Sequence, residues 1–162
     1  MTTNPYGTPS TSGPMPMNGR QHLVNRFVRG LFRLPVLGGL VGRRLLILYV
    51  VGRKTGKEYA IPLAYTRHDG ALVIGARKHP WVRNLRADVP VQISTGGPRR
   101  TADAKVFTDA ENVQRLYEVV ARDNRQNARY NGIGFDADGN PNKADLYQTW
   151  QLGGAIVQLT PR

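Results

Sequence analysis

The sequence predicts a mainly β fold with flanking helices (α+β), built around a small barrel. Apolar runs of strand length, separated by glycine- and proline-containing turns, fill most of the chain after residue 44. A short helical stretch lies between the predicted strands and a longer one follows them. Many short strands with regular turn signals are typical of a closed or partly closed sheet. The 162 residues are enough for one domain with a substantial core.

The N-terminal segment differs from the rest of the chain. Residues 1–19 are polar and rich in Pro, Gly, Ser, Thr and Asn, which predicts a disordered tail without a cleavable signal peptide and a cytoplasmic protein. Residues 20–34 alternate apolar and basic side chains at helical spacing, which predicts a basic amphipathic helix. Its apolar side could pack on its own domain or contact an anionic membrane surface peripherally. Arg43 and Arg44 interrupt the next apolar stretch and argue against a transmembrane helix.

The first two strands are predicted to form a hairpin. Apolar runs at 45–51 and 58–66 flank the segment Gly52-Arg53-Lys54-Thr55-Gly56. Its tip places two adjacent cations near free backbone N–H groups, an arrangement that suits an anionic ligand. The alternative is a solvated turn with two surface charges.

The remaining elements follow from turn residues and periodicity. Asp69-Gly70 indicates a turn, and Gly96-Gly97-Pro98 indicates a second hairpin. Thr108 or Asp109 can cap a helix whose apolar stripe, including Leu116 and Tyr117, is predicted to be core. In order, the predicted elements are a strand at 71–76, a short helix at 79–87, strands at 91–95 and 99–107, a helix to about 124, a long loop at 125–145 and a last strand at 155–160.

Charge points to an anionic partner. The net charge is +12, and the first 57 residues contain nine basic side chains and no acidic one. Such asymmetry favours membrane lipid, nucleic acid or a polyanionic ligand as partner. No recognisable DNA- or RNA-binding motif is present, so we expect no specific nucleic-acid binding.

Several kinds of chemistry are excluded or disfavoured. The chain has no cysteine, which excludes disulfides and thiol catalysis. Its three histidines are far apart in sequence, so we expect no metal site. Residues 136–140 lack the spacing and the final glutamate of a calcium loop. Instead, cations and polar aromatics lie near predicted strand ends, as suits a planar, anionic, conjugated cofactor that carries the chemistry itself. These residues are Arg53, Lys54, Arg77, Lys78, Trp81, Tyr130 and Tyr147.

An ordered set of short motifs between about residues 40 and 160 resembles the deazaflavin-dependent nitroreductase family. The motifs are Gly52-Arg53-Lys54-Thr55-Gly56, Pro62-Leu63, His79-Pro80-Trp81, Asn84-Leu85-Arg86-Ala87 and Tyr147-Gln148-Thr149-Trp150. The resemblance implies a split β-barrel, FMN-binding-protein-like domain over residues 40–162. It also implies hydride transfer from reduced coenzyme F420 to a quinone, a nitro compound or another hydrophobic acceptor. FMN and FAD are weaker candidates for the cofactor.

The resemblance also assigns roles to residues. It implies coenzyme contacts at Arg53, Lys54, Thr55, Gly56, Pro62, Arg77, Lys78 and Trp81, and roles near the reacting centre for Tyr147, Tyr130 and Trp81. In the family the Arg-Lys turn engages the coenzyme's phosphate and glutamate tail. A tyrosine near the reaction centre can orient the acceptor or assist proton delivery.

Departures from the family pattern keep a second function open. The segment 77–81 is shorter than in many members and lacks their glycines, and the loop 131–145 looks inserted. A non-catalytic split-barrel protein that binds a flavin, a tetrapyrrole or a lipid is therefore the alternative. The sequence leaves open whether the protein is a monomer or a dimer.

Overall fold

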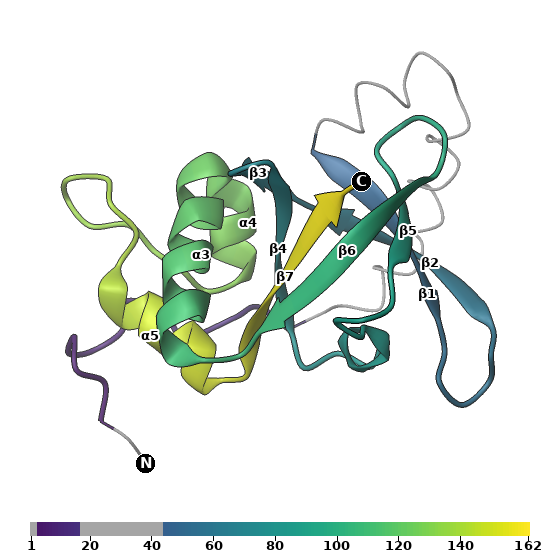
Figure 1. Ribbon diagram of the computed structural model, residues 1–162. Helices are drawn as coiled ribbons and strands as arrows, with labels where there is room; N and C mark the ends of the chain where they lie inside the picture. Colours follow the sequence, from purple (N-terminus) through teal and green to yellow (C-terminus); the bar gives the residue numbers. More distant parts are fainter. Residues whose placement is uncertain (1–2, 17–43) are drawn as a thin grey trace.

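The computed structural model describes residues 3–16 and 44–162, and within them the strands form one curled antiparallel sheet (Figure 1). Its order is β2-β1-β5-β6-β7-β4-β3. The strands are β1 (Leu45–Val51), β2 (Glu58–Ala64), β3 (Thr66–His68), β4 (Ala71–Arg77), β5 (Val91–Ser94), β6 (Arg100–Phe107) and β7 (Gly154–Pro161). This half-barrel agrees with the mainly β fold expected from the sequence.

The curl of the sheet follows from its two edge strands. β2 and β3 occupy opposite ends of the strand order, yet only Tyr65 separates them in the chain. The sheet must therefore curl far enough to bring the end of β2 next to the start of β3. The predicted single strand at 58–66 is divided at this point, where the Tyr65 N–H donates to the Arg44 carbonyl at 3.1 Å.

Alternating side chains place one core inside the half-barrel and a second under the helices. Leu46, Leu48 and Val50 of β1 face the barrel interior and are at most 2% exposed. On β4, Ile74 faces the same interior, whereas Val73 points to the opposite face. That face is covered by α3 (Ala110–Asp123) and α5 (Lys143–Gln151), which lie on one side of the sheet in Figure 1.

Two predicted elements need correction. The expected loop at 125–145 contains the helix α4 (Arg125–Tyr130) and the start of α5. Asn124 and Asn142 cap these helices, each accepting a hydrogen bond from a backbone N–H of the first turn. The expected helix at 79–87 is only a single 3₁₀ turn, η1 (Val82–Asn84), because the chain becomes extended at Leu85.

The described part of the predicted disordered tail is packed against the protein. Residues 3–16, hereafter the arm, lie along α4, α5 and the loop between them. The Asn4 side chain donates to the Ala144 carbonyl at 2.8 Å, and the Met15 N–H donates to the Tyr130 carbonyl at 3.0 Å. These contacts replace the disorder that the composition predicts, because the arm's backbone finds partners far along the chain.

The predicted amphipathic helix at 20–34, and with it the predicted membrane contact, lies outside the described residues. Within residues 3–16 and 44–162, no helix combines the length and apolar character needed to cross a membrane.

Candidate functional site

The turn between β1 and β2 is held in a defined shape. The Gly52 N–H donates to the Lys57 carbonyl and the Gly56 N–H donates to the Gly52 carbonyl, both at 2.9 Å. Gly56 has a φ of +65°, which favours glycine. A Cβ on Gly52 would lie 2.8 Å from Thr55 Oγ1 and 3.0 Å from the Tyr59 ring, so this position also needs glycine. The two glycines therefore fix the loop from which Arg53 and Lys54 project.

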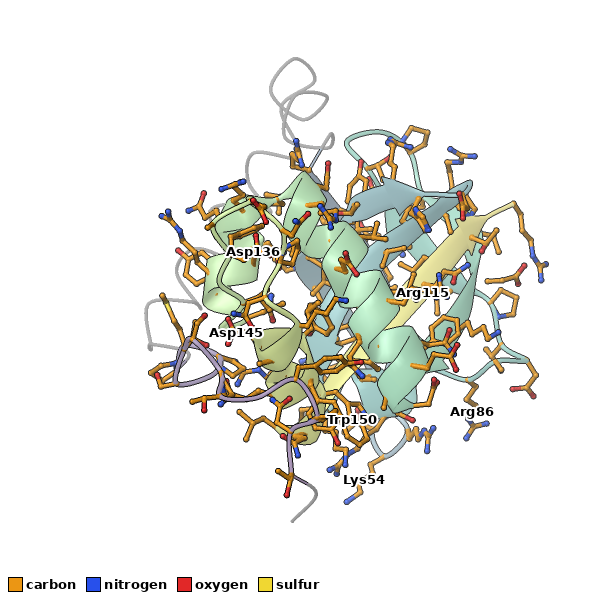
Figure 2. All side chains as sticks on the ribbon, turned by 90° about the vertical axis from the view of Figure 1, so that its left-hand side faces the viewer. Lys54, Arg86, Arg115, Asp136, Asp145 and Trp150 are labelled. Carbon is orange, nitrogen blue, oxygen red and sulfur yellow. The ribbon has the colours of Figure 1, made fainter. Side chains whose placement is uncertain are left out.

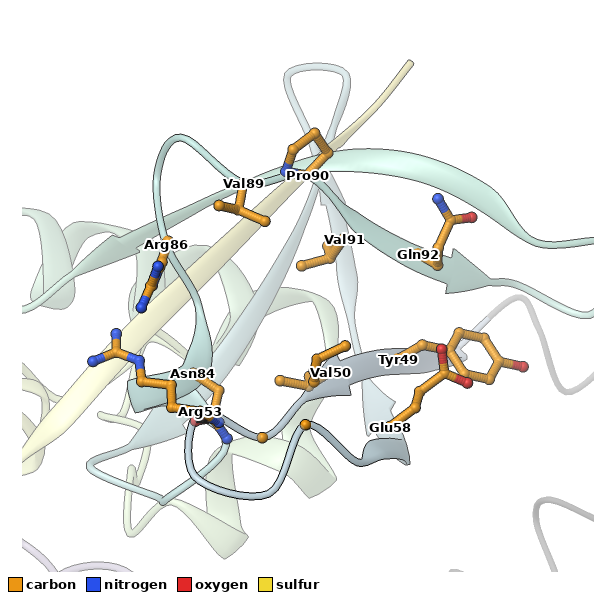
Figure 3. A pocket seen from close by; sticks show the side chains of 13 residues that line it. Tyr49, Val50, Arg53, Glu58, Asn84, Arg86, Val89, Pro90, Val91 and Gln92 are labelled. Carbon is orange, nitrogen blue, oxygen red and sulfur yellow. Dashed lines mark hydrogen bonds between the residues drawn. The ribbon is translucent and has the colours of Figure 1, made fainter.

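A pocket of about 420 Å³ opens beside this turn (Figure 3). β1 and β5 pair over only three residues, ending at Tyr49 opposite Gln92, and beyond this pair the two chains separate. The pocket occupies that separation. It is lined by Tyr49, Val50, Val51, Gly52, Arg53, Gly56, Glu58, Asn84, Arg86, Val89, Pro90, Val91 and Gln92.

One end of the pocket is positively charged. Arg53 and Arg86 lie at this end in Figure 3, and neither guanidinium forms an ion pair within the described ranges. Glu58 at the other end is neutralised by Arg99, whose Nη2 is 3.0 Å from Glu58 Oε1. Asn84 ties η1 to the turn, since its Oδ1 accepts a 3.3 Å hydrogen bond from the Arg53 N–H. The charged end can thus attract an anion, while valines offer an apolar wall.

The segment after β4 lies at the same end of the barrel as the turn. Figure 1 shows the β1–β2 turn at the lower right and α5 at the lower left, with the segment after β4 between them, and Figure 2 shows Lys54 and Trp150 low in the rotated view. The hydrogen bond from the Arg53 N–H to Asn84 joins η1 to the turn. Arg77 pairs with Gly154 of β7, and the Lys78 stem passes next to Gly153. This end of the barrel therefore combines the two predicted coenzyme-contacting segments, 53–56 and 77–81.

Segment 77–81 contains two rings, those of His79 and Trp81, in partly buried surroundings. Trp81 is half-buried and packs against the barrel core. Burial, assisted by the positive charge of Arg77, lowers the pKa of His79 below its ordinary value. A histidine of ordinary pKa is already mostly neutral at pH 7, and the lowered pKa of His79 favours the neutral imidazole further.

The structure groups the predicted site residues only in part. Arg53 and Gly56 line the pocket; the other predicted residues do not. Pro62 lies on β2 opposite Ile47. Tyr147 lies on α5, where its ring contacts Tyr6 and Trp150. The predicted residues outside the pocket lining are Lys54, Thr55, Pro62, Arg77, Lys78, Trp81, Tyr130 and Tyr147.

Tyr130 does not line the pocket and contacts the arm instead. It is the last residue of α4, with a 59% exposed side chain, and its carbonyl binds the arm. Sequence reasoning assigned no role to Arg86 or Val89, which the structure places in the pocket wall. The nearby motif from Asn84 to Ala87 was a signal for Arg86, but the separation of β1 from β5 is a property of the folded sheet.

Comparison with known proteins identifies a family and a fold. The sequence pattern of the F420H2-dependent quinone reductase family matches residues 26–134. No curated protein gives a significant match. A conserved hypothetical protein from Mycobacterium tuberculosis is 19% identical, with 78% of each chain covered and a TM-score of 0.52. A structure described as a domain-swapped dimer is 16% identical, with 87% of this chain and 99% of that chain covered and a TM-score of 0.50.

A structure of an F420-H2 dependent reductase is 18% identical, with 72% of this chain and 94% of that chain covered and a TM-score of 0.48. The two structures with the higher TM-scores show a shared fold. The family match extends over more than half of the chain and includes the turn, the pocket segment and η1.

The residues at this end of the barrel fit coenzyme F420. Its phosphate and glutamate tail are anionic, and Arg53 and Arg86 offer guanidiniums without an ion pair in the described residues. Its conjugated ring requires apolar or aromatic surface, and the valines of the pocket offer apolar surface. Of the two functions that the sequence left open, family membership selects the enzyme. The chain belongs to the F420H2-dependent quinone reductase family and is a deazaflavin-dependent reductase that uses coenzyme F420.

Proposed function

We propose that this reductase transfers a hydride from the reduced coenzyme to a quinone, with nitro compounds and other hydrophobic conjugated molecules as further acceptors. The observation that carries the proposal is the positively charged pocket with an apolar wall, in a chain of this family. A quinone gains a hydride and a proton to become a hydroquinone. The protein must therefore bind an anionic coenzyme, admit an apolar acceptor and allow one proton to reach it.

The glycine-bounded turn is proposed to hold the anionic part of the coenzyme. Arg53 and Lys54 supply the charge and Thr55 supplies a hydroxyl. Gly56, whose N–H donates to the Gly52 carbonyl, supplies the left-handed backbone that shapes the turn around the coenzyme. Arg86 lines the same pocket and adds a second guanidinium. Paired guanidinium and carboxylate or phosphate groups form strong, directional hydrogen bonds.

The segment after β4 is proposed to continue the coenzyme site. Arg77 and Lys78 take the place of the glycines that the family often has here, offering side-chain charge instead of backbone N–H groups. Trp81 gives an aromatic face for the conjugated ring, and Pro62 is proposed to lie along the coenzyme. When bound, the reduced deazaflavin supplies the hydride.

Tyr147 is proposed to act on the acceptor. Its hydroxyl can donate a hydrogen bond to the acceptor oxygen on which negative charge develops, and can pass a proton to it. Tyr130 is proposed as a second hydroxyl on the acceptor side. The aromatic rings of Tyr6 and Trp150 hold the ring of Tyr147 from two directions.

Coenzyme titration tests the proposal directly. We expect the purified chain to quench the fluorescence of coenzyme F420 with about micromolar affinity, a range reached by a few charge-assisted contacts and ring burial. With reduced coenzyme and menadione, we expect oxidation of the coenzyme in step with formation of menadiol. Absence of quenching at saturating protein would sink the proposal. Quenching without turnover of menadione or of a nitro compound would contradict its acceptor half.

Replacing Tyr147 by phenylalanine removes only the hydroxyl. We expect kcat with menadione to fall roughly 100-fold, at the lower end of what general acid catalysis contributes, while the Kd of the coenzyme changes little. Tyr6→Phe is the matched control, because it removes a hydroxyl from the neighbouring ring and keeps the edge-on contact. Equal kcat for the wild type and Tyr147→Phe would exclude a role for this hydroxyl.

A further inference from the structure

A buried carboxylate anchors the arm. Asp145, in the first turn of α5, is 0% exposed. Its Oδ1 accepts hydrogen bonds from the Ser10 N–H at 2.7 Å and the Thr11 N–H at 3.3 Å. Its Oδ2 accepts from the Ser10 hydroxyl at 2.5 Å and the Gly134 N–H at 2.9 Å. Four neutral donors, three of them from the arm, thus surround a buried charge that none of the described salt bridges includes.

The surface under the arm is shaped to receive it. Gly132 has a φ of +72°, and a Cβ there would lie 2.2 Å from the Gly13 backbone carbon. A Cβ on Gly134 would lie 2.7 Å from the Ser10 hydroxyl. The Thr11 hydroxyl donates to the Gly132 carbonyl. A side chain at Gly132 would therefore collide with the backbone of the arm, whereas a Cβ at Gly134 would first meet the Ser10 side chain.

The arm connects the two tyrosines predicted to act near the reaction. Near its start, the Tyr6 ring packs edge-on against Tyr147, with centroids 6.1 Å apart and planes at 67°. At its other end, Met15 is bound to the carbonyl of Tyr130. Trp150 contacts Tyr147 from a second direction, with centroids 5.2 Å apart. Release of the arm would remove one of the two aromatic contacts that orient the Tyr147 ring.

We propose that Asp145 is a positioning residue for acceptor turnover, acting through the arm on Tyr147. This inference rests on the proposed function, because it assumes that Tyr147 works on the acceptor. Asp145 holds Ser10 and Thr11, the arm then presents Tyr6, and Tyr6 restricts the orientation of the Tyr147 ring. The coenzyme's anionic part binds at the β1–β2 turn, which does not contact the arm, so its affinity should not depend on Asp145.

The first test replaces Asp145 by asparagine, which keeps the shape and removes the charge and one acceptor. We expect kcat with menadione to fall roughly tenfold or more, as expected when a reacting group is misplaced, and the Kd of the coenzyme to stay within about twofold. Amide hydrogen exchange at Ser10 and Thr11 should become roughly tenfold faster or more, since their acceptor is weakened. Asp138→Asn changes an exposed acid in the loop before α5; this variant is the matched control and should change neither quantity.

An engineered disulfide that holds the arm in place, called the lock below, separates a positioning role of Asp145 from a role in the stability of the whole protein. The chain has no native cysteine that could compete for an engineered disulfide. A Cβ on Gly134 would lie 2.7 Å from the Ser10 side-chain oxygen, so cysteines at these two positions are close enough to form one. We expect Ser10→Cys/Gly134→Cys, added to Asp145→Asn and oxidised, to regain kcat to within about twofold of wild type, because the lock replaces the lost anchor. Reduction of that disulfide should lower kcat again.

The outcomes separate the two proposals. Equal kcat for the oxidised and reduced lock, or wild-type kcat in Asp145→Asn, overturns the positioning role. A lock that restores kcat supports it even if Asp145→Asn alone is poorly folded. Failure of the wild-type chain to bind the coenzyme overturns the proposed function instead, and hydrogen exchange still shows whether Asp145 anchors the arm.

Discussion

Replacing Arg53 by alanine is expected to weaken coenzyme binding roughly 10- to 100-fold, because a hydrogen bond to a charged group contributes about 1.5–3 kcal/mol. Arg53 projects from a turn that two glycines fix, so little ordering is needed when an anion binds. The measurement is a fluorescence titration of the coenzyme at low and high salt. Wild-type affinity should fall as salt rises, and the variant should respond less.

The control for this variant is Arg115→Ala, which removes an exposed arginine of α3 that does not line the pocket. Its Kd should equal that of the wild type. If Arg53→Ala also bound the coenzyme as the wild type does, Arg53 would be a solvated turn charge, and the tail-binding role of the turn would have to be abandoned.

Replacing Tyr117 by alanine is expected to lower the free energy of unfolding by about 3–5 kcal/mol, the range for deleting a large buried aromatic side chain. Tyr117 is 0% exposed, and its ring lies over Gly75, where a Cβ would approach it to 2.7 Å. Its hydroxyl donates to the Ala76 carbonyl at 2.7 Å. The side chain thus joins α3 to β4 by both packing and a hydrogen bond. Urea unfolding followed by circular dichroism measures the loss.

Tyr117→Phe separates the two contributions. We expect it to cost only about 1 kcal/mol, because the ring remains and one buried hydrogen bond is lost. Burial also raises the pKa of the Tyr117 phenol, so its contribution to stability is complete below the unfolded pKa of about 10 and declines as pH rises above it. The difference between wild type and Tyr117→Phe should therefore shrink at alkaline pH. An equal loss for Ala and Phe variants would contradict the packing argument.

The strands and the long helix could be predicted from the sequence because their signals are local. Alternation along β1 and the turn residues at 69–70 give boundaries within about one residue of those in the structure. Asp109 was one of two predicted caps, and it accepts the Asn112 N–H at 2.9 Å. Each of these features depends on neighbours a few residues away, which a sequence displays directly.

The helices α4 and α5 were missed for a physical reason. α4 has six residues and buries only Ala128, so it shows no apolar period. α5 buries Asp145 and Thr149 next to apolar residues, so its buried face does not show the apolar period that predicts a helix. The cap at Asn142 was the available signal, but asparagine is equally common in loops. The arm's partners are more than a hundred residues away, so no local pattern could reveal its packing.

The candidate site, too, could be predicted from the sequence only in part. The Gly52–Gly56 turn was visible in the sequence because glycines and adjacent cations mark it. The pocket beside it was not, since it exists where β1 and β5 stop pairing after Tyr49. All the roles that the sequence assigned to single residues stay predictions: the coenzyme contacts of Arg53, Lys54, Thr55, Gly56, Pro62, Arg77, Lys78 and Trp81, and the reaction-centre roles of Tyr130, Tyr147 and Trp81.

The arm has a consequence for the order of events during synthesis. Ser10 is made before its partner Asp145, which lies 135 residues later in the chain. At about 5–20 residues per second, the arm waits roughly 7–27 s for its docking surface to exist. Docking can then occur only after the first turn of α5 has been made. A nascent chain that ends before residue 145 lacks the acceptor of the Ser10 and Thr11 N–H groups, so its arm cannot dock as it does in the folded protein.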